Sequence, residues 1–490
     1  MKKLILILLV ALATVSCSSI RKGASSGGEV TGIGAAVFNE TTPYGMVLVD
    51  VGSMREGPNE RDSVWGTDST AHGVSVDAFW MDETEISNSK YKQFVYWVRD
   101  SIIRERLADP AYGGNEEFKI EEDKEGNPVK PHLDWSKNIP WKNPSEDEER
   151  AIESVYRINP ITGVKELDAS QMNYRFEVYN LTEAAKRRHR FDATRRDYNT
   201  DHEVDMTPPT ISKDTAFVDD EGRIVRQTIT RALQSDFDFL NTYIVNIYPD
   251  TTCWVNDFEN AYQEPYVRMY FANGNYNNYP VVGVSWEQAN AFCHWRTEFL
   301  KRSLGDQGIY VEPFRLPTEA EWEFAARAGQ NKNKYPWDGD LPLTVDEGCF
   351  YANFKPDEGN YVKDGYIISA PVGTYEPNDY GLYDMAGNVS EWTSTAYTES
   401  IDRMTDDINP ESATMWHRRT PTRCHARSCV AVPGKMSFTT SAPTCACGST
   451  RTSRGVTSVS AVCAPRWASS RASAKTAART DALPPPTSHN

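Results

Sequence analysis

Residues 381–392 read Gly-Leu-Tyr-Asp-Met-Ala-Gly-Asn-Val-Ser-Glu-Trp, and this stretch decides the fold. It places two carboxylates, Asp384 and Glu391, and the backbone carbonyls of Gly387 and Val389 within one turn-rich loop. Hard oxygen ligands at such spacing suit Ca²⁺. A loop that is held by hydrogen bonds without a metal is the alternative interpretation.

Upstream, residues 315–327 read Arg-Leu-Pro-Thr-Glu-Ala-Glu-Trp-Glu-Phe-Ala-Ala-Arg and predict a helix. Thr318, followed by Glu321 three residues later, is the capping-box pattern that opens a helix, so we expect a helix over 318–328. Acidic side chains at a helix start are favoured by the helix dipole. We therefore interpret the charged residues here as groups that hold the fold rather than as catalytic groups.

Two further segments each combine a strand with a helix. Residues 281–284 are an apolar run, which predicts a strand, and Ser285 predicts the cap of a helix that buries Phe292. Residues 72–76 alternate as a strand does, and residues 87–100 carry apolar side chains at helical spacing.

In their order, these four segments resemble the formylglycine-generating enzyme (sulfatase-modifying factor) family, whose mixed fold is related to the C-type-lectin-like fold. The resemblance covers roughly residues 44–100 and 250–395. It implies an α+β sulfatase-modifying-factor-like domain over residues 44–411.

The resemblance also implies calcium ligands, and Ca²⁺ is the cofactor that it suggests. The positions that match one family site are Asp384, Gly387, Val389 and Glu391, where Asp384 stands at a position at which Asn is also seen. A second site would fall on Asn353, Phe354, Asp364 and Tyr366.

Residues 113–250 differ from the rest of the domain. They are polar, charged and interrupted by Pro, and they contain no helix-long apolar stripe. We interpret them as a long irregular insertion with some hairpins, partly exposed at the surface. A separate small domain is the alternative.

The N-terminus predicts lipid attachment. Two lysines precede an apolar run that is too short to span a bilayer of about 30 Å, so we interpret residues 1–16 as a signal peptide. The residues that end in Cys17 resemble a bacterial lipobox, with Thr where an aliphatic residue is usual. Cys17 would carry acyl and diacylglycerol chains, and residues 17–43 would form a flexible tether. Because no acidic residue follows Cys17 directly, we expect the periplasmic face of the outer membrane; ordinary signal cleavage is the alternative.

Charge and cysteine usage change abruptly near residue 412. The whole chain has 52 Lys and Arg against 69 Asp and Glu, a net charge of −17, which argues against a nucleic-acid partner. After Met415 the chain is basic, with Asp481 as its only acidic residue, and it contains Cys445-x-Cys447. Taken literally, this segment suggests metal or redox chemistry, or a nucleic-acid-binding arm.

A frameshift explains the change better. With a shift of one nucleotide, codons for residues 430–437 can encode Arg-Gly-Gly-Ser-Trp, and those for 458–463 can encode Ile-Gly-Phe-Arg-Cys. These are the two closing segments of the family. We infer a frameshift near residues 409–415 and expect residues 412–490 to be an out-of-frame, disordered tail that lacks the closing strands.

The lipid-bearing cysteine, the long insertion and residues 248–258 together resemble lipoproteins of the GldK/PorK kind. This resemblance implies a non-catalytic structural component of the type IX secretion and gliding motility machinery. Such a component forms a periplasmic homo-oligomeric assembly with a GldN/PorN-like protein and other secretion-apparatus subunits.

The cysteine positions argue against enzyme activity. Formylglycine-generating enzymes use a cysteine pair just after the Arg-Gly-Gly-Ser segment, whereas Cys253, Cys293 and Cys349 lie elsewhere. We therefore expect no catalysis. A formylglycine-generating oxidase that acts on sulfatases, or a lectin-like binding lipoprotein, is the alternative.

Overall fold

The structure is a computed structural model. It describes residues 42–56, 72–122, 125–160, 163–186, 189, 209–219, 221–254, 264–305, 311–329, 336–337, 350–353, 365–396, 407–410, 427–430, 447–449, 457–458 and 462–463. The chain divides into a unit over Met1–Tyr44 and a second unit over Gly45–Asn490. The predicted signal peptide, Cys17 and nearly all of the predicted tether lie outside the described residues.

Short strands form the sheets of the second unit. One four-stranded sheet has the order β1-β4-β18-β13, and another has the order β16-β15-β14-β17. A separate antiparallel hairpin pairs β2 with β3. The bounds are β1 (Met46–Val49), β2 (Gly52–Glu56), β3 (His72–Val76), β4 (Phe79–Asp82), β13 (Phe314–Arg315), β14 (Ser390–Ala396), β15 (Arg427–Val430), β16 (Cys447–Ser449), β17 (Thr457–Ser458) and β18 (Val462–Cys463).

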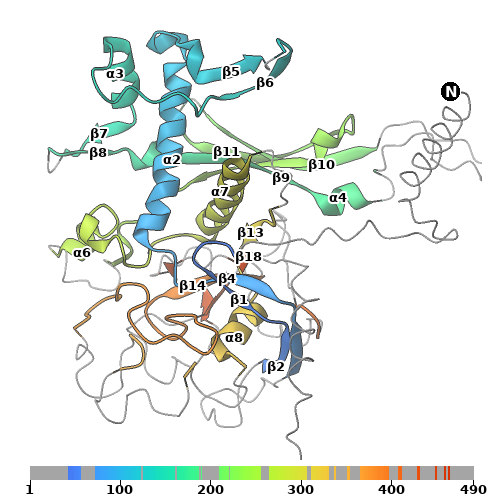
Figure 1. Cartoon of the computed structure of the whole chain (residues 1–490). Helices are drawn as coiled ribbons and strands as arrows, with labels where there is room; N and C mark the ends of the chain where they lie inside the picture. The colour runs from blue at the N-terminus through green and yellow to red at the C-terminus, as the bar shows by residue number, and fades with distance from the viewer. Residues whose placement is uncertain are drawn as a thin grey trace, which may run out of the picture. The chain divides into compact units, whose positions relative to one another are not determined.

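Three capped helices belong to the same unit. They are α2 (Asn88–Leu107), α7 (Trp286–Leu304) and α8 (Glu319–Arg327). The predicted capping box of α8 is confirmed, and Ser285 caps α7 as predicted. Helices α2 and α7 contact each other, and α8 contacts β2, β3 and β14 (Figure 1). No helix among the described residues is both long and apolar enough to cross a membrane.

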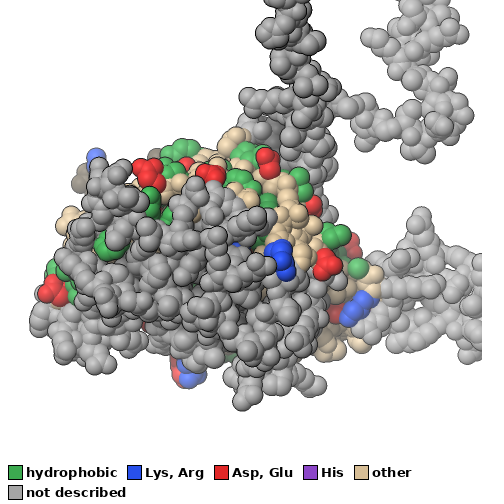
Figure 2. All heavy atoms as spheres, turned by 90° about the horizontal axis from the view of Figure 1, so that it is seen from below, with side chains coloured by type: hydrophobic (Ala, Val, Ile, Leu, Met, Phe, Trp, Pro, Cys, Tyr) green, Lys and Arg blue, Asp and Glu red, His purple; other side chains and the backbone are tan. Residues whose placement is uncertain are grey.

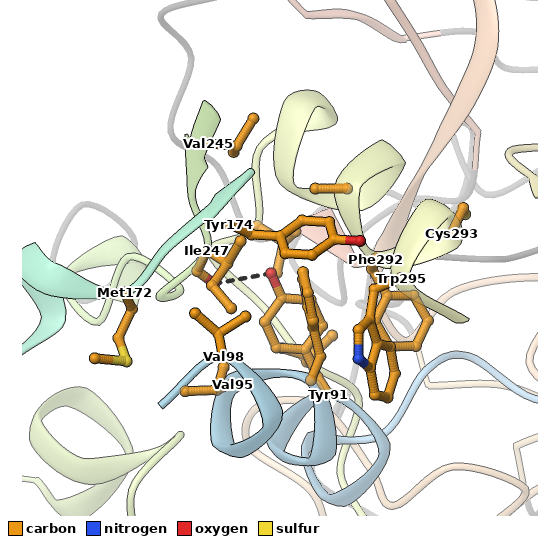
Figure 3. Packing of buried hydrophobic residues seen from close by; sticks show 14 of the residues in the cluster. Tyr91, Val95, Val98, Met172, Tyr174, Val245, Ile247, Phe292, Cys293 and Trp295 are labelled. Carbon is orange, nitrogen blue, oxygen red and sulfur yellow. Dashed lines mark hydrogen bonds between the residues drawn. The ribbon is translucent and has the colours of Figure 1, made fainter. Parts of the chain in front are cut away.

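The largest core cluster lies between α2 and α7. Tyr91 of α2 stacks on Phe292 of α7 with ring centroids 5.5 Å apart. The buried Tyr91 hydroxyl donates a hydrogen bond to the Ile247 carbonyl over 2.9 Å (Figure 3). Met172 and Tyr174 also belong to this cluster. Because three of these residues come from the predicted insertion, the insertion shares its core with the rest of the domain.

The insertion is more regular than we expected. The predicted hairpins are present as β5–β6, β7–β8 and β10–β11, and β9 pairs with β12. The alternative of a separate domain is wrong, because apolar residues of β9 and β12 are buried against α2 and α7. The bounds are β5 (Lys119–Glu122), β6 (Pro128–Leu133), α3 (Glu146–Glu153), β7 (Tyr156–Ile158), β8 (Lys165–Leu167), β9 (Asn173–Tyr179), α4 (Leu181–Ala185), β10 (Thr210–Val218), β11 (Ile224–Ala232) and β12 (Leu240–Asn246).

Short helical turns complete the described structure. The α-helix α6 covers Pro265–Met269. The 3₁₀ turns are η1 (Pro110–Tyr112), η2 (Glu116–Phe118), η3 (Ala169–Gln171), η6 (Asp236–Phe239) and η7 (Gly274–Tyr276).

The expectation that residues 412–490 form no closing strands is wrong, because four short strands, β15 to β18, lie in this segment. β15 pairs with β14, and β18 pairs with both β4 and β13. Backbone N–H and C=O groups form these ladders whatever the side chains are, and the strands that border them would otherwise leave such groups unpaired. The rest of the tail lies outside the described residues.

Candidate functional site

The 381–392 loop packs closely on a neighbouring segment. Gly387 has a φ of +87°, and a Cβ placed there would lie 2.3 Å from the Asn353 carbonyl oxygen. The Asn388 backbone N–H donates to that same oxygen over 2.8 Å. Asp384 and Asn388 also have positive φ values, 53° and 54°. Glycine is therefore needed at 387 both for its conformation and for the close approach.

The Asn388 side chain joins three segments of the chain. Its Nδ2 donates to Glu85 Oε1 over 2.9 Å. Its Oδ1 accepts from the Ala370 backbone N–H over 2.8 Å and from Asn353 Nδ2 over 3.3 Å. Glu85 lies between β4 and α2, so this amide connects the start of the domain with the loop that decides its fold.

Two buried carboxyl groups meet beside Asn388. Asp384 and Glu85 are 7% and 2% exposed. The Gly373 backbone N–H donates to Asp384 Oδ2 over 2.8 Å. Within the described chain, Asp384 Oδ1 and Glu85 Oε2 are buried and receive no hydrogen bond from an N–H group. The two carboxyl groups lie within hydrogen-bonding reach of each other.

Burial and like charge disfavour ionisation in this pair. Burial raises the pKa of Glu85 well above its ordinary value, and the charges of Asp384 and Glu391 raise it further. Burial also raises the pKa of Asp384, while the hydrogen bonds from Gly373 and with Glu85 act in the opposite direction. Two acidic groups in one buried place hold a negative charge only at a cost.

Glu391 lies at the start of β14 and is held by a different partner. Its Oε2 accepts a hydrogen bond from Trp322 Nε1 of α8 over 2.6 Å. Both residues are buried. Trp322 thus fixes one oxygen of this carboxylate.

The predicted ligands divide between described and undescribed residues. Asp384, Gly387, Val389 and Glu391 are buried on the 381–392 loop and at the start of β14. Asn353 contacts this loop, and Tyr366 is half-buried. Phe354 and Asp364 lie outside the described residues.

Sequence reasoning assigned no role to Glu85. The segment that contains it, 72–94, was recognised, and a carboxylate directly before a buried helix start is unusual. This position could have identified Glu85 as a candidate site residue. Its partner Asn388 could not have been identified in the same way, because it lies 303 positions away in the chain.

The donor chemistry of the site fits a hard cation. Carboxylate oxygens and loop carbonyls are the ligands that Ca²⁺ prefers. In the part of the chain that the structure describes, no three His, Cys, Asp or Glu side chains gather closely enough to hold a metal by themselves. Backbone carbonyls or water would therefore have to complete the coordination of a bound ion.

The described cysteines lie in two different cores. Cys293 packs in the cluster of α2 and α7, and Cys253 packs with Trp254 and Val389. Burial raises the pKa of Cys293 to about 12. Since the thiolate is the reactive form, Cys293 is unreactive at neutral pH. Cys349 lies outside the described residues.

The family is decided by a match over most of the chain. Residues 35–188 and 200–480 match the family described as sulfatase-modifying factor enzyme 1-like domain. The chain belongs to this family. The family part of the sequence prediction is thereby confirmed.

Individual relatives match a shorter region. Formylglycine-generating enzyme of Mus musculus is 37% identical over 143 residues, which is 28% of this chain and 32% of that protein. Inactive C-alpha-formylglycine-generating enzyme 2 of Bos taurus is 41% identical over 120 residues, 24% of this chain and 34% of that protein. The chain thus spans about a third of the length of these relatives. Among solved structures it is similar to PvdO from Pseudomonas aeruginosa, with 14% identity, a TM-score of 0.39, and coverage of 86% of this chain and 94% of that one.

Proposed function

We propose that this chain is a non-catalytic, lipid-anchored building block of the type IX secretion and gliding machinery. In this proposal Cys17 carries the lipid at the periplasmic face of the outer membrane. The sulfatase-modifying-factor domain, on a fold related to the C-type-lectin-like fold, assembles into an oligomer with a GldN/PorN-like protein.

The state of the thiols carries the non-catalytic part of the proposal. Oxidation by a formylglycine-generating enzyme needs accessible, reactive thiols. Cys253 and Cys293 are each 2% exposed, and Cys293 is protonated at neutral pH because of burial. These two thiols cannot form a reactive pair, since they belong to separate clusters.

The surface of the insertion supports a role in assembly. Several apolar side chains stand out from it, among them Ile158 at 72%, Leu181 at 74% and Phe237 at 74% exposure. Figure 2 shows another face, seen from below in the view of Figure 1, and there too acidic, basic and apolar side chains of described residues are intermixed. A mixed surface of this kind suits contact with proteins better than contact with nucleic acid.

Calcium has a structural role in this proposal. Asp384, Gly387, Val389 and Glu391 would hold the ion, which would tie the 381–392 loop to β14. The second site, at Asn353, Phe354, Asp364 and Tyr366, would hold another ion beside it. The buried Asp384 Oδ1, which receives no N–H, supports the first of these sites.

Membrane fractionation tests the anchoring. The parent chain should sediment with outer membranes, and Cys17→Ala should shift it to the soluble periplasmic fraction because the acyl chains are lost. Ser18→Ala serves as the matched control and should leave the protein with the membranes. Membrane association of Cys17→Ala at the parent level would contradict the proposed anchor.

A formylglycine-generating oxidase is the second candidate, and the 37% identity to the mouse enzyme favours it. Incubation of the purified chain with a cysteine-containing sulfatase peptide separates the two functions. We expect no aldehyde product by mass spectrometry, with an active formylglycine-generating enzyme as the positive control. Turnover would overturn the non-catalytic proposal.

A further inference from the structure

Aromatic and arginine side chains gather along one side of α2. Trp97 of α2 stacks on Trp135, with ring centroids 4.9 Å apart and ring planes inclined by 9°. The Arg302 guanidinium of α7 lies 5.5 Å and 5.8 Å from the centres of these two rings. The Arg104 guanidinium lies 4.3 Å from the centre of the Trp135 ring. Cation–π contacts of this kind hold the two indoles and Arg302 against each other.

The same helix carries two further rings that are exposed. The Arg99 guanidinium lies 4.7 Å from the centre of the Tyr96 ring and 5.1 Å from that of Trp141. Tyr96 is 45% and Trp141 is 48% exposed. The segment 135–141, which carries both partner indoles, is held on α2 by a hydrogen bond of 3.1 Å from Arg104 to the Lys137 carbonyl. The aromatic–arginine patch is defined as Tyr96, Trp97, Arg99, Trp135, Trp141 and Arg302.

The composition of the aromatic–arginine patch favours contact with protein. Trp, Tyr and Arg are enriched among the residues that carry most of the binding energy at protein interfaces. Ordering of free side chains is one of the costs of association. Because Arg99 already holds Tyr96 and Trp141 in place, burial of these two rings against a partner would cost little side-chain entropy.

The patch also carries a positive charge that no carboxylate in the described chain neutralises. Arg302 is exposed, and its contacts among the described residues are with the two indole rings. Arg99 pairs with Asp100 over 2.7 Å, and Lys301 beside Arg302 pairs with Glu298 over 3.0 Å. The charge of Arg302 therefore favours a partner that presents a carboxylate.

The chain itself presents carboxylates of this kind at the start of α3. Helix α3 contacts α2 (Figure 1), and its first turn is acidic at every position. Asp147 pairs with Arg150, and Glu148 belongs to the capping box. The exposed Glu146 and Glu149 side chains have no cation as a partner within the described residues. This turn is complementary in charge to the aromatic–arginine patch.

We propose that the aromatic–arginine patch of one copy binds the acidic first turn of α3 on a second copy of this chain. Arg302 would pair with Glu146 or Glu149, and Tyr96 and Trp141 would bury their exposed faces beside this pair. The inference rests on the proposed homo-oligomer and names its contact surface. Because the contact joins two different surfaces, each copy can hold two neighbours, as an oligomer of more than two copies requires.

Sedimentation of the full 490-residue chain tests the contact. All proteins carry Cys17→Ala and are kept in a mild detergent, so that neither acyl chains nor the apolar N-terminus cause association. The parent should self-associate, and more weakly at high salt. Arg302→Glu and Trp141→Ala should each weaken self-association roughly tenfold or more. Arg55→Glu reverses an exposed arginine on β2 and is the matched control, which should associate as the parent does.

Charge exchange separates a direct contact from a general loss of positive charge. Reversal of both Glu146 and Glu149 to Arg should weaken self-association as Arg302→Glu does. A chain that combines all three substitutions should associate again, because the pair is restored with its signs exchanged. An equimolar mixture of the two defective proteins should associate for the same reason. Thermal unfolding should show parent-like melting of these charge variants, since all three side chains are exposed.

The outcomes distinguish this inference from the proposed oligomer. Parent-like association of Arg302→Glu, or failure of the combined exchange to restore association, would overturn the contact and leave an oligomer built on another surface. A parent that stays monomeric at low and high salt would overturn both the contact and the homo-oligomer, and would assign the patch to a different protein partner. Anchoring through Cys17 is tested separately by membrane fractionation.

Discussion

At the scale of single residues, Gly387 has the most sharply defined requirement. Gly387→Ala should destabilise the domain by about 2 kcal/mol or more. The left-handed conformation costs an alanine roughly 1–2 kcal/mol, and its Cβ would lie 2.3 Å from the Asn353 carbonyl oxygen. Urea unfolding measures the loss. Gly126→Ala is the control, because Gly126 has a φ of +81° but no atom within 4 Å of an added Cβ. Equal losses in the two variants would show that the close approach to Asn353 does not matter.

Cys293 should make stability depend on alkaline pH. Burial raises its pKa from 9.0 to about 12, so the thiol resists ionisation only in the folded chain. A raised folded-state pKa gives stability that is complete below the unfolded value and is lost as pH rises toward the folded value. The parent should therefore lose more unfolding free energy between pH 9 and about 12 than Cys293→Ala does. Cys293→Ala should be less stable than the parent at every pH because the substitution leaves a cavity. The quantity to compare is therefore the slope of unfolding free energy against pH in the two proteins. Parallel slopes would contradict the assignment.

At the scale of elements, the start of α8 is held by reciprocal bonds. The Glu321 backbone N–H donates to Thr318 Oγ1 over 3.1 Å, and the Thr318 backbone N–H donates to Glu321 Oε2 over 2.8 Å. Thr318→Ala should cost about 1 kcal/mol of stability in urea unfolding. Thr318→Ser keeps the hydroxyl and should stay close to the parent. A neutral Thr318→Ala would mean that packing of α8 alone fixes its first turn.

The sequence could predict those elements whose start is encoded by a short run of neighbouring residues. The α8 capping box and the Ser285 cap of α7 each lie within four consecutive residues. The packing of the insertion has no such signal. Its core side chains come from short strands, and each strand contributes only a few, such as Tyr174 of β9 and Val245 of β12. A short polar strand with one or two buried residues does not show a periodic pattern, so its role depends on tertiary contacts.

The same limit applies to the candidate site. The spacing of Asp384, Gly387 and Glu391 within one loop could be interpreted directly from the sequence. The contact between Glu85 and Asn388 could not, because it depends on how β4, α2 and the loop pack together. Sequence reasoning therefore found the 381–392 loop and missed Glu85.

At the scale of the whole molecule, the closing strands link the ends of the domain. β18 pairs with β4 near the start of the domain and with β13 in its second half. β15 pairs with β14, so that Trp392 and Cys429 are register partners. These two strands overlap or adjoin residues 430–437 and 458–463, whose codons yield Arg-Gly-Gly-Ser-Trp and Ile-Gly-Phe-Arg-Cys in the shifted frame. The backbone ladders therefore lie where the restored segments would be needed.

Restoring the frame near residues 409–415 should stabilise the molecule. The restored segments bring Trp, Ile and Phe to the positions of the closing strands, and each such side chain contributes about 1.5–3 kcal/mol when it is fully buried. We expect a frame-restored chain to melt cooperatively and several degrees above the 490-residue chain, measured by calorimetry and urea unfolding. A chain that ends after residue 411 is the control and should be the least stable of the three, since it lacks β15 and β18. Equal stability of the restored and 490-residue chains would contradict the frameshift, because the restored Trp, Ile and Phe are larger apolar side chains than the Val and Cys of β15 and β18.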